Sequence, residues 1–169
     1  MNVIQRLRQT KLLTTLPLLL WIAVGELICY GLAYPTWPLF LCMVSFFLAK
    51  QRREAAGGIV IGIVTGEGIC WVMKSLWLPA AADRLGTFPA QLIFVLVFVL
   101  AIAYLEPIFP LCMNSHTFLA FLVAALAVPF SPGLWMCISF FGGSICIAGC
   151  LLIQRLAAAG SPGEERCEQ

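Results

Sequence analysis

Long apolar runs recur along the chain, and they limit the folds open to it more than any other feature. A soluble domain carries charges on roughly a quarter of its residues. Here only 11% of the 169 residues are charged and 62% are hydrophobic. A run of about 18 apolar residues is long enough for a helix to cross about 30 Å of hydrocarbon. The sequence therefore predicts an all-α, polytopic transmembrane helical bundle whose main partner is the lipid bilayer.

We expect about six spans, each ending near a proline or a basic cluster. The predicted segments are residues 15–34, 36–49, 57–78, 89–107, 111–130 and 133–154. The second is the shortest, so the number of spans depends on it. Together they predict a single transmembrane domain over residues 1–155, and the small, polar residues 156–169 predict a disordered cytoplasmic tail.

The positions of Lys and Arg predict the orientation. These residues cluster before the first segment, between the second and third, and after the sixth: Arg6, Arg8, Lys11, Lys50, Arg52, Arg53, Arg155 and Arg166. Six spans place all three clusters on one face, whereas five would divide them between two faces. We therefore expect both termini in the cytoplasm.

Two acidic residues lie inside predicted spans. Glu67 lies about ten residues into the third segment, roughly 15 Å along the helix axis, and Glu26 lies at a similar depth in the first. A charge at this depth costs about 2.5–3.5 kcal/mol on insertion scales, and such residues mark ion pathways, proton relays or ligand sites by default. The alternative is a neutral carboxyl that is hydrogen-bonded to a neighbouring helix. We predict a substrate- or ion-binding site at Glu67 and Glu26.

Three glycines of the third segment, Gly58, Gly62 and Gly66, repeat at every fourth residue. This spacing places them on one helix face, where small residues allow a second helix to approach closely. No Gly-Lys-Ser or Gly-Lys-Thr sequence follows them, so they do not form a phosphate-binding loop. They predict a helix-packing face, which suggests self-association or contact with another membrane protein.

A polar break separates the fourth and fifth segments at "EPIFPLCMNSHTF". Glu106, Asn114 and His116 predict a polar vestibule there, and the alternative is a helix start capped by Asn114 or Ser115. Cys112 and His116 have a spacing that is compatible with a metal or thiol–imidazole site, but the ligand set is incomplete. We therefore expect no metal, no cofactor, no catalytic residue and no enzymatic activity.

Residues near the predicted outer surface have interfacial character. Lys74 follows Glu67 by seven residues, about 10 Å along the axis, so we expect its amino group to reach water rather than to pair with Glu67. Trp37, Trp77 and Trp135 are typical of the aromatic belt at a membrane surface. Basic residues do not alternate with aromatic ones anywhere in the sequence, so no nucleic-acid partner is expected.

A family resemblance extends over most of residues 16–155. The pattern is carried by Trp21, Ala23, Val24, Trp37, Phe40, Cys42, Phe46, Phe47, Ala49, Gly57 and Gly58, and more loosely by Thr117, Phe118 and "FFGGSICIAG". It resembles the DUF1097 family of small bacterial inner-membrane proteins, which have no assigned function. The resemblance implies a bacterial inner-membrane protein of related architecture, and it implies no site residues.

Two hypotheses for function follow from these features. The first is a transporter or channel component for a small polar solute or ion, which uses the carboxyls of Glu67 and Glu26. The alternative is a non-catalytic accessory or scaffold protein that associates through its glycine-rich helix face.

Overall fold

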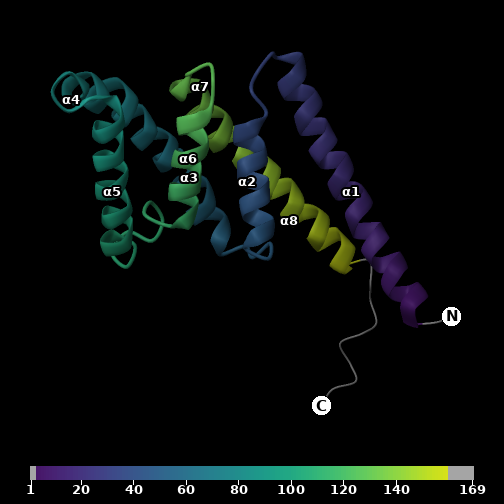
Figure 1. Cartoon of the computed structure of the whole chain (residues 1–169). Helices are drawn as coiled ribbons and strands as arrows, with labels where there is room; N and C mark the ends of the chain where they lie inside the picture. The colour runs from purple at the N-terminus through teal and green to yellow at the C-terminus, as the bar shows by residue number, and fades with distance from the viewer. Residues whose placement is uncertain (1–2, 160–169) are drawn as a thin grey trace. The chain divides into compact units, whose positions relative to one another are not determined.

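The structure is a computed structural model that describes residues 3–159, with side chains described from residue 16 to residue 156. Within this part of the chain all regular structure is helical (Figure 1). Two elements, η1 and η2, are single π-helical turns within longer helices. The elements are α1 (Val3–Gly31), α2 (Trp37–Leu48), α3 (Ala55–Val72), η1 (Met73–Trp77), α4 (Leu78–Leu85), α5 (Thr87–Leu105), α6 (Ser115–Leu126), α7 (Pro132–Cys137), η2 (Ile138–Gly142) and α8 (Gly143–Ala159).

Three continuous helices are long and apolar enough to cross a membrane: Ala55–Leu85, Thr87–Leu105 and Pro132–Leu156. The all-helical prediction is therefore confirmed for the described residues, and each of the six predicted segments contains a helix. The other apolar helices are shorter. The tail predicted from residue 156 begins inside α8, which ends at Ala159, and residues 160–169 lie outside the described part of the chain.

The predicted fifth segment, residues 111–130, is helical over a much shorter stretch than expected. Its helix α6 has only 12 residues, which corresponds to about 18 Å. It begins after Asn114, whose backbone is extended, and it ends before Ala127, which has φ −70° and ψ 138°. Extended residues at both ends prevent the helix from continuing, so the polar break occupies residues that the apolar pattern had assigned to a span.

The predicted third segment, in contrast, continues beyond its expected end at residue 78. Pro79 has no N–H group, and its ring conflicts with the carbonyl one turn earlier in a regular helix. The π-helical turn η1 precedes it, and the N–H of Leu78 donates to the carbonyl of Met73. This wider turn accommodates the proline, so the helix runs on through α4 to Leu85.

Backbone contacts divide the chain into two compact units, residues 37–144 and a unit that combines α1 with α8 from Ile145 onward. In the second of these, the indole Nε1 of Trp21 donates to the carbonyl of Cys146 at 3.1 Å. Gly149 lies against the same indole, and a Cβ at this position would overlap the ring. The missing side chain therefore allows α1 and α8 to approach each other.

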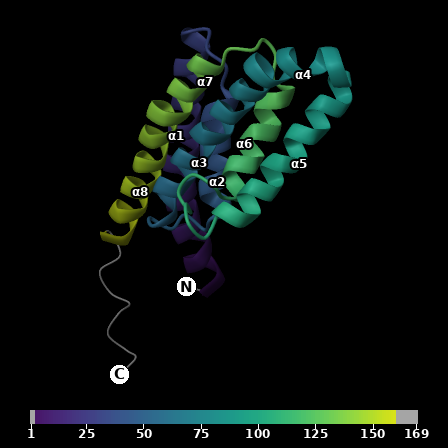
Figure 2. The same ribbon diagram turned by 90° about the vertical axis from the view of Figure 1, so that its left-hand side faces the viewer.

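The closest helix pair in residues 37–144 is α3 and α6, which lie side by side in both views (Figures 1 and 2). Gly58, Gly62 and Gly66 all face α6. A Cβ at Gly62 would lie 2.6 Å from Oδ1 of Asn114, and one at Gly66 would lie 2.9 Å from the Cβ of Ala120 and would overlap a backbone carbonyl of α6. The glycine face is therefore covered by a helix of the same chain.

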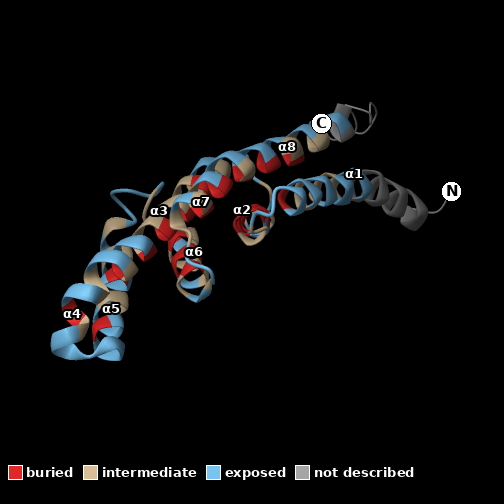
Figure 3. Cartoon of the chain, turned by 90° about the horizontal axis from the view of Figure 1, so that it is seen from above, coloured by how far each residue is buried: buried red, intermediate tan, exposed pale blue. Residues whose placement is uncertain are grey.

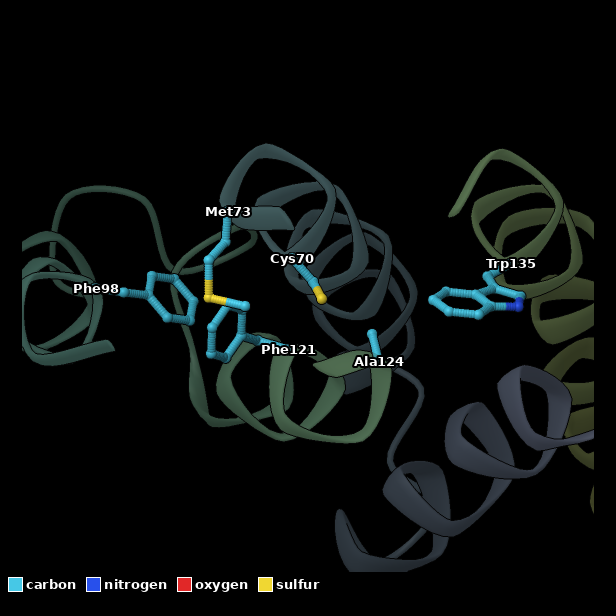
Figure 4. Packing of buried hydrophobic residues seen from close by; sticks show 6 residues of the cluster. All are labelled: Cys70, Met73, Phe98, Phe121, Ala124 and Trp135. Carbon is cyan, nitrogen blue, oxygen red and sulfur yellow. The ribbon is translucent and has the colours of Figure 1, made fainter. Parts of the chain in front are cut away.

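An apolar cluster joins α3, α5, α6 and α7. The sulfur of Met73 lies beside the rings of Phe98 and Phe121 (Figure 4), and these two rings are 4.7 Å apart between centroids. The buried members are Cys70, Met73, Phe98, Phe121, Ala124 and Trp135. Between helices in lipid, close packing of such side chains contributes van der Waals contacts that hold the helices together.

Trp135 belongs to this cluster rather than to an aromatic belt. Its side chain is only 1% exposed, and its ring meets Trp37 at 5.1 Å and Phe130 at 5.5 Å between centroids. The interfacial interpretation of Trp135 is therefore wrong, because the position near a segment end does not reveal that α7 turns this residue inward.

The opposite character is found on α5, which is exposed over most of its surface (Figure 3). Its exposed residues are large and apolar: Leu92, Ile93, Leu96, Val97, Val99 and Leu100. Exposing these apolar side chains to water is unfavourable, whereas lipid chains are as apolar as the side chains themselves. The surface of α5 agrees with its classification as a helix that can cross a membrane.

We expect Gly66→Ala to lower the free energy of unfolding by about 1–3 kcal/mol, because the added methyl group overpacks the contact with α6. Thermal unfolding in detergent micelles measures the change. Gly57→Ala is the matched control, since a Cβ there meets open space and alanine favours the helix. Equal stability of the two variants would contradict the close approach of α3 and α6.

Candidate functional site

Glu67 lies at the centre of the unit formed by residues 37–144. It follows Gly66 on α3, so its side chain points away from the face that contacts α6. The carboxyl is fully buried, with 0% exposure. A buried carboxyl is costly unless it is hydrogen-bonded or paired, so its partners determine what it can do.

The partner of Glu67 is a hydroxyl group from a distant part of the chain. Oγ of Ser139 donates to Oε1 of Glu67 at 2.7 Å, across 72 positions of sequence. Ser139 is also fully buried. The other carboxyl oxygen of Glu67, Oε2, is buried and has no hydrogen-bond partner. One oxygen is therefore held in place while the other stays available to a ligand or a proton.

The π-helical turn η2 explains why Ser139 is presented in this way. The N–H of Gly143 donates to the carbonyls of Ile138 and Phe140, so the carbonyl of Ser139 between them is left for another donor. The thiol of Cys42 on α2 fills this role at 3.6 Å. A π-helical turn inside an α-helix frequently marks a functional site, and here the hydroxyl and the carbonyl of Ser139 both bind residues of other helices.

The contact with α2 depends on the absence of a side chain at Gly143. A Cβ there would lie 2.5 Å from Sγ of Cys42. Ser45 lies about one turn after Cys42 on the same helix, is fully buried, and has a hydroxyl with no hydrogen-bond partner. The centre thus combines a carboxyl, a hydroxyl and a thiol from α3, η2 and α2, with unused bonding capacity at Oε2 of Glu67.

Glu26, the second predicted acid, lies on α1 in the other unit and is half-buried. Its Oε1 is buried without a hydrogen-bond partner, which is the same condition as Oε2 of Glu67. A site shared by the two carboxyls stays a prediction, because it would join residues of two separately described units.

At the polar break, the structure places Asn114 and His116 together at the start of α6. Oδ1 of Asn114 accepts from the backbone N–H groups of His116 and Thr117. The hydroxyl oxygen of Thr117 in turn accepts from the backbone N–H of Asn114, which completes a capping box. Nδ2 of Asn114 donates to the carbonyl of Gly58 on α3 at 3.0 Å. This arrangement confirms the alternative of a capped helix start.

The other residues of the break make separate contacts. Glu106 is exposed at the end of α5, and His116 is half-buried. Cys112 offers its carbonyl to the hydroxyl of Thr117 at 2.6 Å. Among the described residues, Cys112 and His116 do not belong to a group of three or more side chains that could hold a metal ion. The vestibule stays a prediction.

Lys74, which was expected to reach water, is bound within the protein. Its Nζ donates to the carbonyl of Ala125 at 2.8 Å and to that of Ala124 at 3.4 Å, and it lies 4.9 Å from the centroid of Phe130. The last carbonyls of a helix lack intrahelical partners, and a cation there opposes the negative end of the helix dipole. The amino group of Lys74 therefore binds the end of α6, which the sequence did not predict, and not Glu67, as expected.

Comparison of the chain with models of protein families, with curated proteins and with solved structures gives no match. The resemblance to the DUF1097 family accordingly stays a prediction. What can be inferred about function depends on the geometry of the residues themselves.

We expect Ser139→Ala to lower the free energy of unfolding by about 1–3 kcal/mol, because it removes a hydrogen bond from a buried carboxyl. Ser144→Ala is the matched control, since Ser144 is exposed one turn later in the same continuous helix. Thermal unfolding of both variants in micelles measures the difference. A Ser139→Ala variant as stable as the control would argue against the bond to Glu67.

We expect Lys74→Met to lower the free energy of unfolding by about 1 kcal/mol, because methionine keeps the apolar stem and loses the bonds to the end of α6. Lys50→Met is the control, as Lys50 is exposed. Hydrogen exchange of the last turn of α6, measured by mass spectrometry, should rise only in Lys74→Met. Unchanged exchange there would exclude the capping role.

Proposed function

We propose that the chain is a multi-pass protein of the bacterial inner membrane that carries a small polar solute or an ion, with Glu67 as its binding carboxyl. The observation that carries the proposal is Oε2 of Glu67, an acidic oxygen that is buried and unpartnered in the middle of a membrane-length helix. Ionisable groups at such positions mark transport pathways by default. Glu26 is proposed as a second binding group, and no catalytic role is proposed.

The proposed topology is a single transmembrane domain with six spans and both termini in the cytoplasm. Its support is the clustering of Lys and Arg described above. The short helices α2 and α6, with 12 residues each, reach the membrane surfaces through the non-helical residues that flank them. Irregular backbone at membrane depth is tolerated where protein covers it; Asn114 at the start of α6 is buried, whereas Ile108 and Val128 in the flanking segments are exposed.

The alternative function, an accessory or scaffold protein that associates through its glycine face, receives less support. Gly62 and Gly66 are covered by α6 of the same chain. A partner helix would have to displace α6 to use this face.

We expect Glu67→Gln to reduce the rate of transport by about tenfold or more. A tenfold change corresponds to about 1.4 kcal/mol in the free energy of binding. Glutamine keeps the size of the side chain and the acceptor for Ser139, but it cannot ionise. The measurement is the current of proteoliposomes on a solid-supported membrane, after concentration jumps of H⁺, Na⁺, K⁺, amino acids, organic acids and amines.

Glu54→Gln is the control for this experiment, because Glu54 is an exposed carboxyl with no cap hydrogen bond, and the variant should leave the current unchanged. The site assignment fails if Glu67→Gln carries every solute that the wild-type protein carries, at the same rate and the same protein level.

A further inference from the structure

The two carboxyl oxygens of Glu67 differ in a way that determines where a proton can bind. Oε1 accepts the hydroxyl hydrogen of Ser139 at 2.7 Å, so it has the role of the carbonyl oxygen of a carboxylic acid. Oε2 has no partner and is buried. A protonated carboxyl has one O–H donor and one carbonyl acceptor. The bond from Ser139 therefore directs a proton to Oε2.

The ionisable groups around Glu67 do not supply a positive charge that would hold it as a carboxylate. The thiol of Cys42 faces it from α2, and that of Cys70 lies about one turn further along α3. The amino group of Lys74, two turns from Glu67, donates to carbonyls at the end of α6. On α6 the ionisable group is His116 in the first turn, and on α7 and η2, which present Ser139, it is the exposed Cys137.

A metal cation fits this position less well than a proton. Ions such as Ca²⁺ and Mg²⁺ need several oxygen ligands at once. The hydroxyl hydrogen of Ser139 points to Oε1, and the carbonyl of Ser139 is occupied by the thiol of Cys42. A proton needs only one lone pair, which Oε2 provides. The buried, hydrogen-bonded residues around Glu67 therefore fit a proton better than a metal cation.

We propose that Glu67 binds one exchangeable proton at Oε2 and that Ser139 is the positioning residue that selects this oxygen. This proposal rests on the transport role, and it names the proton as the ion that the centre couples to transport. Binding forms one O–H bond at Oε2 and leaves the side chain neutral. Release breaks that bond, leaves a carboxylate and returns the proton to water.

Infrared difference spectroscopy of the protein in lipid tests the proposal, because the carbonyl stretch of a protonated carboxyl is separate from that of a carboxylate. The full chain is measured over a series of pH values in H₂O and in D₂O. We expect a carboxylic acid band that decreases as the pH rises, shifts in D₂O, and is absent in Glu67→Gln. Glu54→Gln should keep the band.

Ser139→Ala separates positioning from a merely structural role. Loss of the hydrogen bond to Oε1 should move the band of Glu67 to a higher wavenumber, since a carbonyl with no donor vibrates faster. Ser139→Thr keeps the hydroxyl and should return the band to its original position. A band that is identical in Ser139→Ala and the wild type would overturn the positioning role.

Three results would overturn the proton site: no band that depends on Glu67 at any pH, a band that neither changes with pH nor shifts in D₂O, or loss of the band when Na⁺ is added at constant pH. The last would identify a cation as the ligand. If the band behaves as expected while Glu67→Gln transports normally, the proton site stands and the transport role fails. If transport needs Glu67 but no band is found, the transport role stands and the proton site fails.

Discussion

The contact between α3 and α6 is the constraint on which the rest of residues 37–144 depends. Because Gly62 and Gly66 have no side chains, the backbone of α6 lies directly against α3, and the amide of Asn114 fits over Gly62. Its bond to the carbonyl of Gly58 fixes the point at which α6 begins. Glu67, the residue after Gly66, then projects in a different direction and meets Ser139. The glycine face thus orients the acidic side chain that neighbours it.

Two π-helical turns place the polar side chains that a regular helix would not present. Lys74 lies in η1, and its amino group binds the end of α6. Ser139 lies in η2, and its hydroxyl and carbonyl bind two different elements. A π-helical turn inserts one residue into an α-helix and breaks the regular pattern of backbone bonds. At both turns, a residue of the irregular segment therefore contacts a neighbouring helix.

Much of the fold follows from local properties of the sequence. Apolar runs and the prolines and polar residues between them predict the six helical segments, and the four-residue spacing predicts the glycine face. The positions of the helix ends were less predictable. Pro79 does not end its helix because η1 accommodates it, and α6 is shortened because Asn114 caps it through contacts with α3.

The residues of the candidate site also differ in whether the sequence alone could predict them. Glu67 could be selected from the sequence, because an acid in an apolar run is costly wherever it lies. Ser139 could not, since a serine in an apolar helix is common and its role depends on a partner 72 residues away. The partners of Lys74 and Trp135 were missed for the same reason, because they come from α6, α2 and the segment between α6 and α7.

The sequence by itself determined that the chain is helical and apolar, that it contains helices of membrane length, and that it holds acids among them. These properties depend on hydrophobicity and on backbone hydrogen bonds within a helix, which are local. The tertiary structure alone decided that α6 covers the glycine face, that Oε1 of Glu67 is occupied and that Oε2 is free. Such pairings depend on which helices pack together, and that is set by contacts between residues far apart in the chain.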